Sequence, residues 1–237
     1  MTTLTPIYNE HPAATVAATV SDHIIARGDR PTLLLIAGGA LPEEVLPHID
    51  QAVYSPALTI CIFDERCTED EAGLNERQLH VTPFSTAAVA AGVHTMEVVV
   101  GDSDTCEVVA ADWEERLHAW KAAHPDGALV VLAGVGADGH IAGILCHTPE
   151  ETPVFTGASW IVRHHFHQTD NPYPDRITPT FTFWQDAVAA TFIYMNGPAK
   201  RTALARILAR SGDLATTPGR VLRSLSHVRL FTDQTDL

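Results

Sequence analysis

Residues 128–145, with the sequence ALVVLAGVGADGHIAGIL, determine the fold of this chain. They begin as an uninterrupted apolar run and pass into a glycine-rich loop that carries two titratable side chains, Asp138 and His140. A continuous apolar run closed by glycines is typical of a strand buried on both faces in a parallel sheet. We therefore expect a buried strand over 128–133 with this loop at its carboxyl end.

Two earlier segments repeat the pattern. Residues 32–37 (TLLLIA) are followed by Gly38 and Gly39, and residues 58–63 (LTICIF) are followed by the charged triplet 64–66. Ligands of open α/β sheets bind at the carboxyl ends of the strands. We therefore expect these segments and the loop after residue 133 to meet at one rim of the sheet.

Helical periodicity separates the apolar runs. Helices are expected over 13–27, over a short segment from Pro42 that Pro47 interrupts, over 106–123 and over 198–208. Further strands are expected over 94–100, 160–162, 177–184 and 191–195, and a mobile loop over 148–157. The alternation predicts an α/β fold, a doubly wound, mostly parallel sheet with helices on both faces. No linker or internal repeat divides the sequence, so we expect one domain over residues 1–237.

The composition excludes several classes of protein. The 237 residues include 15 Lys and Arg against 29 Asp and Glu, and the net charge of −14 opposes binding to nucleic acid or anionic membranes. The chain has neither a basic and apolar leader nor an apolar run long enough to span a membrane, so we expect a cytoplasmic protein. Because the four cysteines form no CxxC pair, we expect all of them to be reduced.

The loop after residue 133 carries the candidate chemistry. Gly136 and Gly139 would let the backbone approach a ligand closely. A histidine that a carboxylate orients can transfer protons near neutral pH, which suits His140 beside Asp138. Taken alone, the same residues also fit a structural role, in which Asp138 caps a short helix and His140 packs beneath a loop.

Several other groups could bind an anion. Gly38 and Gly39 precede an expected helix start and offer backbone N–H groups, although an ordinary tight turn has the same pattern. Arg66 could bind an anion with two hydrogen bonds or pair with a neighbouring acid, and Arg176 opens a strand. Lys200 is one of two lysines and lies in the first turn of a helix, where the dipole disfavours a cation. Its position therefore suggests a function.

Two cofactor-based alternatives have less support in the sequence. Gly134, Gly136 and Gly139 match GxGxxG after a strand, but the long helix and distant acid of a dinucleotide site are missing. The histidines at 164, 165 and 167 cluster without a partner motif for a metal. We expect a solvated strand edge there, and no metal site.

Five segments, taken together and in order, resemble the superfamily of 6-phosphogluconolactonases and glucosamine-6-phosphate deaminases/isomerases. They are LLLIAGGALP (33–42), FDERCTEDEAGLNERQL (63–79), LVVLAGVGADGHIAGIL (129–145), DRITPTF (175–181) and MNGPAKRTALARIL (195–208). The triplet at 64–66, Asn75 and the Arg-Ile-Thr at 176–178 resemble the lactonase branch. The deaminase branch has a catalytic glutamate at the position of Leu145.

The resemblance implies hydrolysis of 6-phosphogluconolactone to 6-phosphogluconate, a step of the pentose phosphate pathway, without a metal or organic cofactor. It implies that His140, oriented by Asp138, transfers protons while water attacks the lactone carbonyl. The implied residues for binding substrate and phosphate are Gly38, Gly39, Arg66, Asn75, Gly136, Gly139, Arg176 and Lys200, with Asp64 and Thr178 as secondary candidates. The expected partner is a phosphorylated sugar lactone, and the expected protein is a monomer or a dimer.

The sequence also departs from the lactonase pattern. Ala40 replaces the Ser or Thr of the phosphate loop, and residues 144–147 (ILCH) replace a Phe-Pro-Gly segment. The His-Ile-Ala order at 140–142 is similar to the deaminase branch. Two alternatives therefore remain open. One is a deaminase or isomerase that uses Asp64 as a carbon base, and the other is a sugar-phosphate-binding protein without activity.

Overall fold

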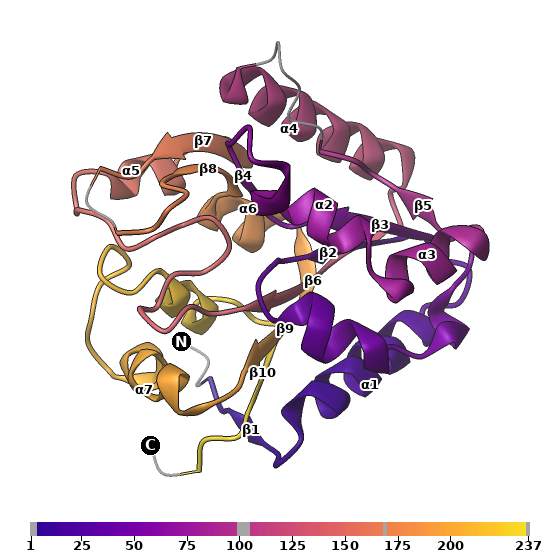
Figure 1. The fold of residues 1–237 in the computed structure, drawn as a ribbon, viewed down its shortest axis with the longest axis horizontal. Coiled ribbons are helices and arrows are strands. Elements are labelled where there is room, and N and C mark those ends of the chain that lie inside the picture. Colours follow the sequence, from indigo (N-terminus) through magenta and orange to yellow (C-terminus); the bar gives the residue numbers. More distant parts are fainter. Residues whose placement is uncertain (1–3, 99–104, 168–169, 236–237) are drawn as a thin grey trace.

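A seven-stranded parallel sheet forms the centre of the molecule, and helices surround it (Figure 1). The computed structural model describes residues 4–98, 105–167 and 170–235. The strands are β1 (Ile7–Tyr8), β2 (Thr32–Ile36), β3 (Leu58–Ile62), β5 (His94–Thr95), β6 (Ala128–Gly134), β9 (Val188–Met195) and β10 (Val228–Thr232), in the order β1-β10-β9-β6-β2-β3-β5. A second, three-stranded antiparallel sheet contains β4 (Glu65–Arg66), β8 (Asp175–Pro179) and β7 (Ile161–His165), in that order.

Helix α1 lies on one side of the large sheet, and α6 with the three-stranded sheet lies on the other (Figure 1). The α-helices are α1 (Pro12–Ile25), α2 (Asn75–His80), α3 (Pro83–Ala90), α4 (Cys106–Ala123), α5 (Thr152–Phe155), α6 (Phe181–Asp186) and α7 (Arg201–Leu208). Shorter helical turns are η1 (Leu41–Val45), η2 (Leu46–His48), η3 (Gln51–Val53), η4 (Glu71–Gly73), η5 (Pro198–Lys200) and η6 (Pro218–Arg223). No helix in the described ranges is long and apolar enough to cross a membrane.

The apolar runs of the sequence become the buried centre of the sheet. Leu34 of β2 lies between Ile60 of β3 and Val130 of β6, and each of these side chains is at most 1% exposed. Such a strand has no polar face because helices or the second sheet cover both of its faces. The prediction of a mostly parallel α/β sheet is therefore confirmed.

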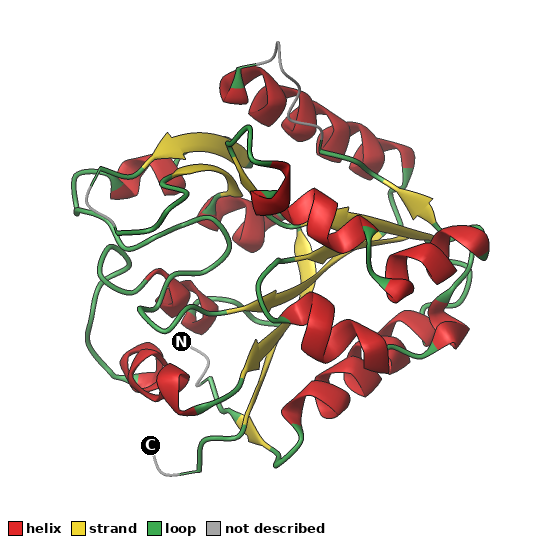
Figure 2. Cartoon of the chain, viewed as in Figure 1, coloured by secondary structure: helices red, strands yellow, loops and turns green. Residues whose placement is uncertain are grey.

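The strand order reverses between β2 and β6. From β2 the chain continues outward to β3 on one side, whereas β6 is followed outward by β9 and β10 on the other. A crevice opens at such a switch point, outside the carboxyl ends of the strands. Long loops gather on this side of the sheet (Figure 2). The loops after β2 and β6 are therefore neighbours here.

The strand expected over 177–184 is only half right. Strand β8 ends at Pro179, and helix α6 follows. The hydroxyl of Thr180 accepts a hydrogen bond from the backbone N–H of Phe183 at 3.1 Å, which caps the helix. Because Thr and Phe alternate in this segment, the sequence pattern favoured a strand and did not indicate that Thr180 caps a helix. Two further differences are that the segment from Pro42 forms only the short turns η1 and η2, and that the expected loop 148–157 contains α5.

Two other expectations concern the edge of the large sheet. The strand expected over 94–100 is observed as the two residues of β5, and residues 99 and 100 lie outside the described ranges. Strand β10, which was not expected, pairs with β9 from Val228 to Thr232. Its sequence VRLFT exposes Arg229 and buries the last three residues, so no continuous apolar run marks it.

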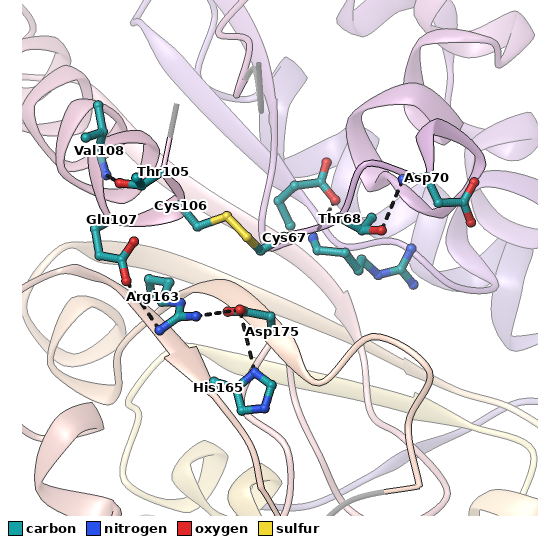
Figure 3. Close-up of a disulfide and its surroundings, with 12 residues drawn as sticks. Cys67, Thr68, Asp70, Thr105, Cys106, Glu107, Val108, Arg163, His165 and Asp175 are labelled. Carbon is teal, nitrogen blue, oxygen red and sulfur yellow. Dashed lines mark hydrogen bonds and ion pairs between the residues drawn. A yellow bond between two sulfur atoms is a disulfide. The ribbon is translucent and has the colours of Figure 1, made fainter. Parts of the chain in front are cut away.

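The expectation that all cysteines are reduced is wrong. Cys67 and Cys106 form a disulfide with their Cα atoms 6.0 Å apart, whereas Cys61 and Cys146 are free (Figure 3). The bonded cysteines are separated by 39 residues in sequence, so no short motif indicated the pair. The fold brings them together because Cys67 follows β4 and Cys106 begins α4.

Candidate active site

A cavity of about 310 Å³ lies at the carboxyl ends of β2, β3, β6 and β9. It brings together most of the predicted residues. Those that line it are Gly38, Gly39, Asp64, Arg66, Asn75, Gly136, His140, Arg176 and Lys200. Asp138 adjoins the cavity through His140, whereas Gly139 and Thr178 do not line it.

The loop after β6 folds back on itself to present His140. The backbone N–H of Gly136 donates to the carbonyl of His140 at 2.9 Å, and Val135 and Ile144 both bridge to Ile141. Ala142 has a φ of +50°, which is uncommon for a residue with a side chain. The position of the imidazole therefore depends on a closely hydrogen-bonded local backbone.

Asp138 holds the ring of His140 through its carboxylate. Its Oδ1 lies 2.7 Å from His140 Nδ1 and 3.1 Å from the backbone nitrogen of the same residue. Partial burial alone would raise the pKa of Asp138, but its hydrogen bonds with His140 and their electrostatic attraction lower the pKa to about 2. The carboxylate is thus ionised at neutral pH. With Nδ1 occupied, Nε2 is the ring nitrogen left to act on a ligand.

Glycine is required at two positions of this loop. A Cβ atom on Gly136 would overlap with His140 Nδ1 and Asp138 Oδ1. Gly139 has a φ of +104°, and its carbonyl accepts a hydrogen bond from Gly219 at 2.9 Å. Gly139 therefore shapes the loop from behind the cavity.

Thr178 also supports the loop from behind. The backbone N–H of Gly143 donates to its hydroxyl at 3.1 Å, and Thr178 is fully buried. Because Thr178 lies in β8, this hydrogen bond ties the His140 loop to the strand that carries Arg176.

Two arginines come from neighbouring strands of the small sheet. Arg66 and Arg176 are directly opposite each other in the register of β4 and β8. Arg176 is 5% exposed, its Nη1 lies 3.9 Å from Asp64 Oδ2, and its Nε donates to the carbonyl of Tyr173 at 2.8 Å. Burial lowers the pKa of Arg176 and raises the pKa of Asp64, and each shift is opposed by the partner's charge.

Tyr173 contacts both arginines. The Cζ atom of Arg66 lies 5.5 Å from the centre of its ring, and Arg66 donates from Nη1 to the carbonyl of Gly73. The Tyr173 hydroxyl donates to Asp70 Oδ2 at 2.8 Å. The loop before β8 and the turn η4 thus hold the guanidinium groups at the cavity.

Asn75 is positioned by a residue that the sequence analysis did not assign. Glu65 is fully buried, and its carboxylate accepts hydrogen bonds from the backbone N–H groups of Arg66, Asn75 and Glu76 at 2.6–2.8 Å. Burial raises the pKa of Glu65 to about 7, although these donors lower it in part. The Asn75 side chain donates to the carbonyl of Asp64 at 2.7 Å and leaves no room for a side chain at Gly38.

Lys200 also lines the cavity. Its Nζ donates to the carbonyl of Val135 at 2.6 Å. Burial lowers its pKa, whereas the nearby charges of Asp138 and Glu44 raise it. Lys200 is therefore held beside the His140 loop, at the end of the cavity that also contains Glu44.

Four polar residues at the cavity were not predicted from the sequence: Glu44, Asn171, Tyr194 and Asn196. The Tyr194 hydroxyl donates to Glu44 Oε2. Tyr194 and Asn196 lie at the carboxyl end of β9, so the rule that gathered the other segments could have found them. Asn171, whose Oδ1 accepts from Arg176 Nη2 at 3.1 Å, lies in a loop without such a signal.

The histidine cluster lies away from the cavity, on the edge strand β7 and just after it. His164 Nε2 lies 3.0 Å from Glu151 Oε1, His165 Nδ1 lies 3.6 Å from Asp175 Oδ2, and His167 is exposed. Within residues 4–98, 105–167 and 170–235, no group of three or more His, Cys, Asp or Glu could hold a metal ion.

Comparisons with known proteins agree with this architecture. Residues 9–230 match the family model of glucosamine-6-phosphate isomerases/6-phosphogluconolactonase. No curated protein matches the sequence. A 6-phosphogluconolactonase from Shewanella baltica OS155 superposes with a TM-score of 0.75 at 19% identity over 98% of this chain and 97% of that one. The enzyme from Leishmania guyanensis gives 0.75 at 19% over 98% and 96%, and that from Thermotoga maritima gives 0.71 at 17% over 98% and 99%.

Proposed function

The chain belongs to the family of glucosamine-6-phosphate isomerases and 6-phosphogluconolactonases, and from this premise we propose that it hydrolyses 6-phosphogluconolactone to 6-phosphogluconate. One observation carries the choice of reaction. His140, with Asp138 on its Nδ1, lines the same cavity as Arg66, Arg176 and Lys200. A proton-transfer group thus faces a cluster of cations in a chain whose net charge is −14.

The cations suit a phosphorylated substrate. Guanidinium groups bind phosphate through paired hydrogen bonds, and backbone N–H groups next to glycines add further donors. In the proposed complex, Arg176, Lys200 and the loop at Gly38 and Gly39 hold the phosphate. Arg66 binds phosphate or the oxygens near the lactone. Ala40 supplies no hydroxyl, so the backbone and the cations carry this binding.

The proposed proton path uses one imidazole twice. Nε2 of His140 first accepts a proton from the water that attacks the lactone carbonyl. It then gives the proton to the ring oxygen as the ester bond breaks, so the ring ends neutral. Asp138 stabilises the charged imidazole between the two steps. Such general acid–base catalysis is typically worth ~10² to 10⁴ in rate.

The deaminase alternative has less support in the geometry. Where the deaminase branch has its catalytic glutamate, this chain has Leu145, which carries no carboxylate. Leu145 is 2% exposed and packs in the core. Asp64 does line the cavity, and burial raises its pKa, which would suit a carbon base. The two reactions are therefore best separated by their products.

The test is an assay of freshly prepared 6-phosphogluconolactone, followed as acid release above the spontaneous rate. We expect hydrolysis by the wild type and an enzymatic rate lowered by ~10² to 10⁴ with His140→Ala. The same preparation should release no ammonia from glucosamine 6-phosphate. Ammonia release without lactone hydrolysis would contradict the proposal and favour the deaminase.

A further inference from the structure

The Cys67–Cys106 disulfide begins one residue after Arg66, which lines the cavity. Cys67 directly follows Arg66 in the chain, and Cys106 is the first residue of α4, a helix that lines no part of the cavity. The bond therefore connects a ligand-facing strand to a distant helix.

The strand that it follows brings two like charges together. Arg66 and Arg176 are a directly opposed pair between β4 and β8, and both line the cavity. Like charges at directly opposed positions destabilise a sheet. Strand β4 has only two residues, so few ladder hydrogen bonds resist this repulsion. Asp64 offsets part of it from 3.9 Å away from Arg176.

The disulfide opposes this repulsion by fixing the residue next to Arg66. Helix α4 packs against β7 and β8, and Glu107 of α4 forms an ion pair with Arg163 at 3.3 Å. Arg163 also pairs with Asp175, whose carbonyl accepts the backbone N–H of Cys67 at 3.0 Å. Figure 3 shows the disulfide beside this chain of ion pairs. With the S–S bond broken, Cys67 would lose its covalent link to α4 and keep its backbone hydrogen bond to Asp175.

We infer that this disulfide is a redox-sensitive link that controls the affinity of the cavity for phosphorylated ligands, tight when oxidised and weaker when reduced. The inference rests on the proposed function only in that the cavity binds a phosphate ester. An anion between Arg66 and Arg176 relieves the same repulsion that the disulfide restrains. Ligand and disulfide therefore favour each other, and this coupling must be reciprocal.

The reductant is a dithiol. One of its thiolates attacks a sulfur of the Cys67–Cys106 bond, which breaks and leaves a mixed disulfide and one cysteine thiolate. The second thiol of the reductant displaces the protein sulfur and forms a cyclic disulfide. The protein gains two electrons and two protons as two thiols. Cys67 is only half-buried, which gives a small dithiol a route to the bond.

The test compares the affinities of the oxidised and reduced full-length protein. Titration calorimetry with 6-phosphogluconate and with inorganic phosphate is run before and after dithiothreitol treatment, with thiols counted in each sample. We expect reduction to weaken binding of both ligands by about fivefold or more, which is the usual range of such couplings. If the disulfide only stabilised the fold, its reduction would lower the melting temperature and leave both affinities unchanged.

A matched control removes the bond permanently. The double variant Cys67→Ser/Cys106→Ser should bind 6-phosphogluconate as weakly as the reduced wild type, with no further effect of dithiothreitol. Circular dichroism of the reduced wild type and of the variant establishes that each is folded at the assay temperature. In the reciprocal experiment, 6-phosphogluconate should raise the dithiothreitol concentration needed to reduce half of the Cys67–Cys106 bonds.

The outcomes separate this inference from the proposed function. Equal affinities of the oxidised and reduced protein, with complete reduction shown by thiol counting, would overturn the redox link and leave the lactonase proposal standing. A dithiothreitol effect of the same size in the double variant would also overturn it. No binding of either ligand by the oxidised protein would overturn both.

Discussion

The two sides of the cavity are held in place in different ways. On one side, the loop after β6 positions His140 through its own backbone hydrogen bonds and through Asp138, two residues away. On the other side, Arg66 and Arg176 lie on strands that are far apart in the chain, and contacts between these segments hold them. Arg66 is paired with Arg176 across β4 and β8 and packs against Tyr173, and the disulfide ties the residue after Arg66 to α4.

This difference separates the two proposed functions of the site. Proton transfer needs a fixed imidazole, and a short loop with glycines at required positions provides one locally. Anion binding needs like charges close together, and contacts between segments far apart in the sequence bring them there. We therefore expect substitutions in the loop to change the rate, and changes at the arginine side to alter ligand affinity and its response to pH and redox conditions.

The largest effect is expected from Gly136→Ala. Its Cβ would overlap with His140 Nδ1 and Asp138 Oδ1, so the pair must move apart. We expect kcat on 6-phosphogluconolactone to fall by ~10² to 10⁴, the usual contribution of general acid–base catalysis. Steady-state kinetics would measure the change.

The matched control is Gly157→Ala. A Cβ at this exposed position would lie 3.5 Å from the nearest atom, the carbonyl oxygen of Pro153, which is an ordinary contact. Its kcat should equal that of the wild type. Normal kcat in Gly136→Ala would show that the loop tolerates movement of the histidine.

A smaller effect is expected on the arginine side from Glu76→Gln. Burial, with the charge of Glu65, raises the pKa of Glu76 from 4.5 to about 8, although the N–H of Val98 opposes the shift. Between pH 4.5 and about 8, the Glu76 carboxyl is therefore protonated in the folded protein and ionised in the unfolded chain. The free energy of unfolding should fall as the pH rises between these two values, by at most about 1.4 kcal/mol per pH unit.

Urea unfolding of the wild type and of Glu76→Gln from pH 5 to pH 8 measures this slope. The glutamine side chain cannot ionise, so the variant should lose less stability as the pH rises. Glu65, whose pKa is raised to about 7, still contributes a slope in both proteins. Parallel curves would show that Glu76 ionises normally in the folded protein.

The smallest effect is expected from Tyr173→Phe. The variant keeps the ring beside Arg66 and the backbone carbonyl that binds Arg176, and it loses the hydrogen bond to Asp70. A single hydrogen bond is typically worth about 0.5–1.5 kcal/mol, so the Kd for 6-phosphogluconate should rise by at most about tenfold. Tyr173→Leu, which also removes the ring, should bind more weakly than Tyr173→Phe. Equal affinities of the two variants would exclude a role for the ring.

The central sheet could be predicted from the sequence because its signals are local. The runs that form β2, β3 and β6 are apolar throughout and end in glycine or charged residues, as buried parallel strands do. Strand β10 and helix α6 could not be identified in this way. Partial exposure interrupts the apolar pattern of β10. In α6, tertiary contacts and the Thr180 cap favour a helix although the side chains alternate as in a strand.

The residues of the candidate site also differ in whether the sequence could predict them. The rule that strands end at a common rim predicted that His140, Arg66 and Gly38 would meet. It did not reveal Glu65 as the residue that holds Asn75, because three backbone N–H groups must converge on one buried carboxylate. The disulfide was missed because the spacing of Cys67 and Cys106 carries no signal until the fold brings the start of α4 to the end of β4.

The most direct test of the account determines kcat and KM separately for His140→Ala and Arg176→Lys on 6-phosphogluconolactone. Arg176→Lys keeps a positive charge near the buried Asp64 and loses the paired hydrogen bonds of the guanidinium. The account predicts that His140→Ala lowers kcat by ~10² to 10⁴ with little change in KM, and that Arg176→Lys raises KM with kcat nearly retained. A normal kcat in His140→Ala, or a loss in Arg176→Lys confined to kcat, would contradict it.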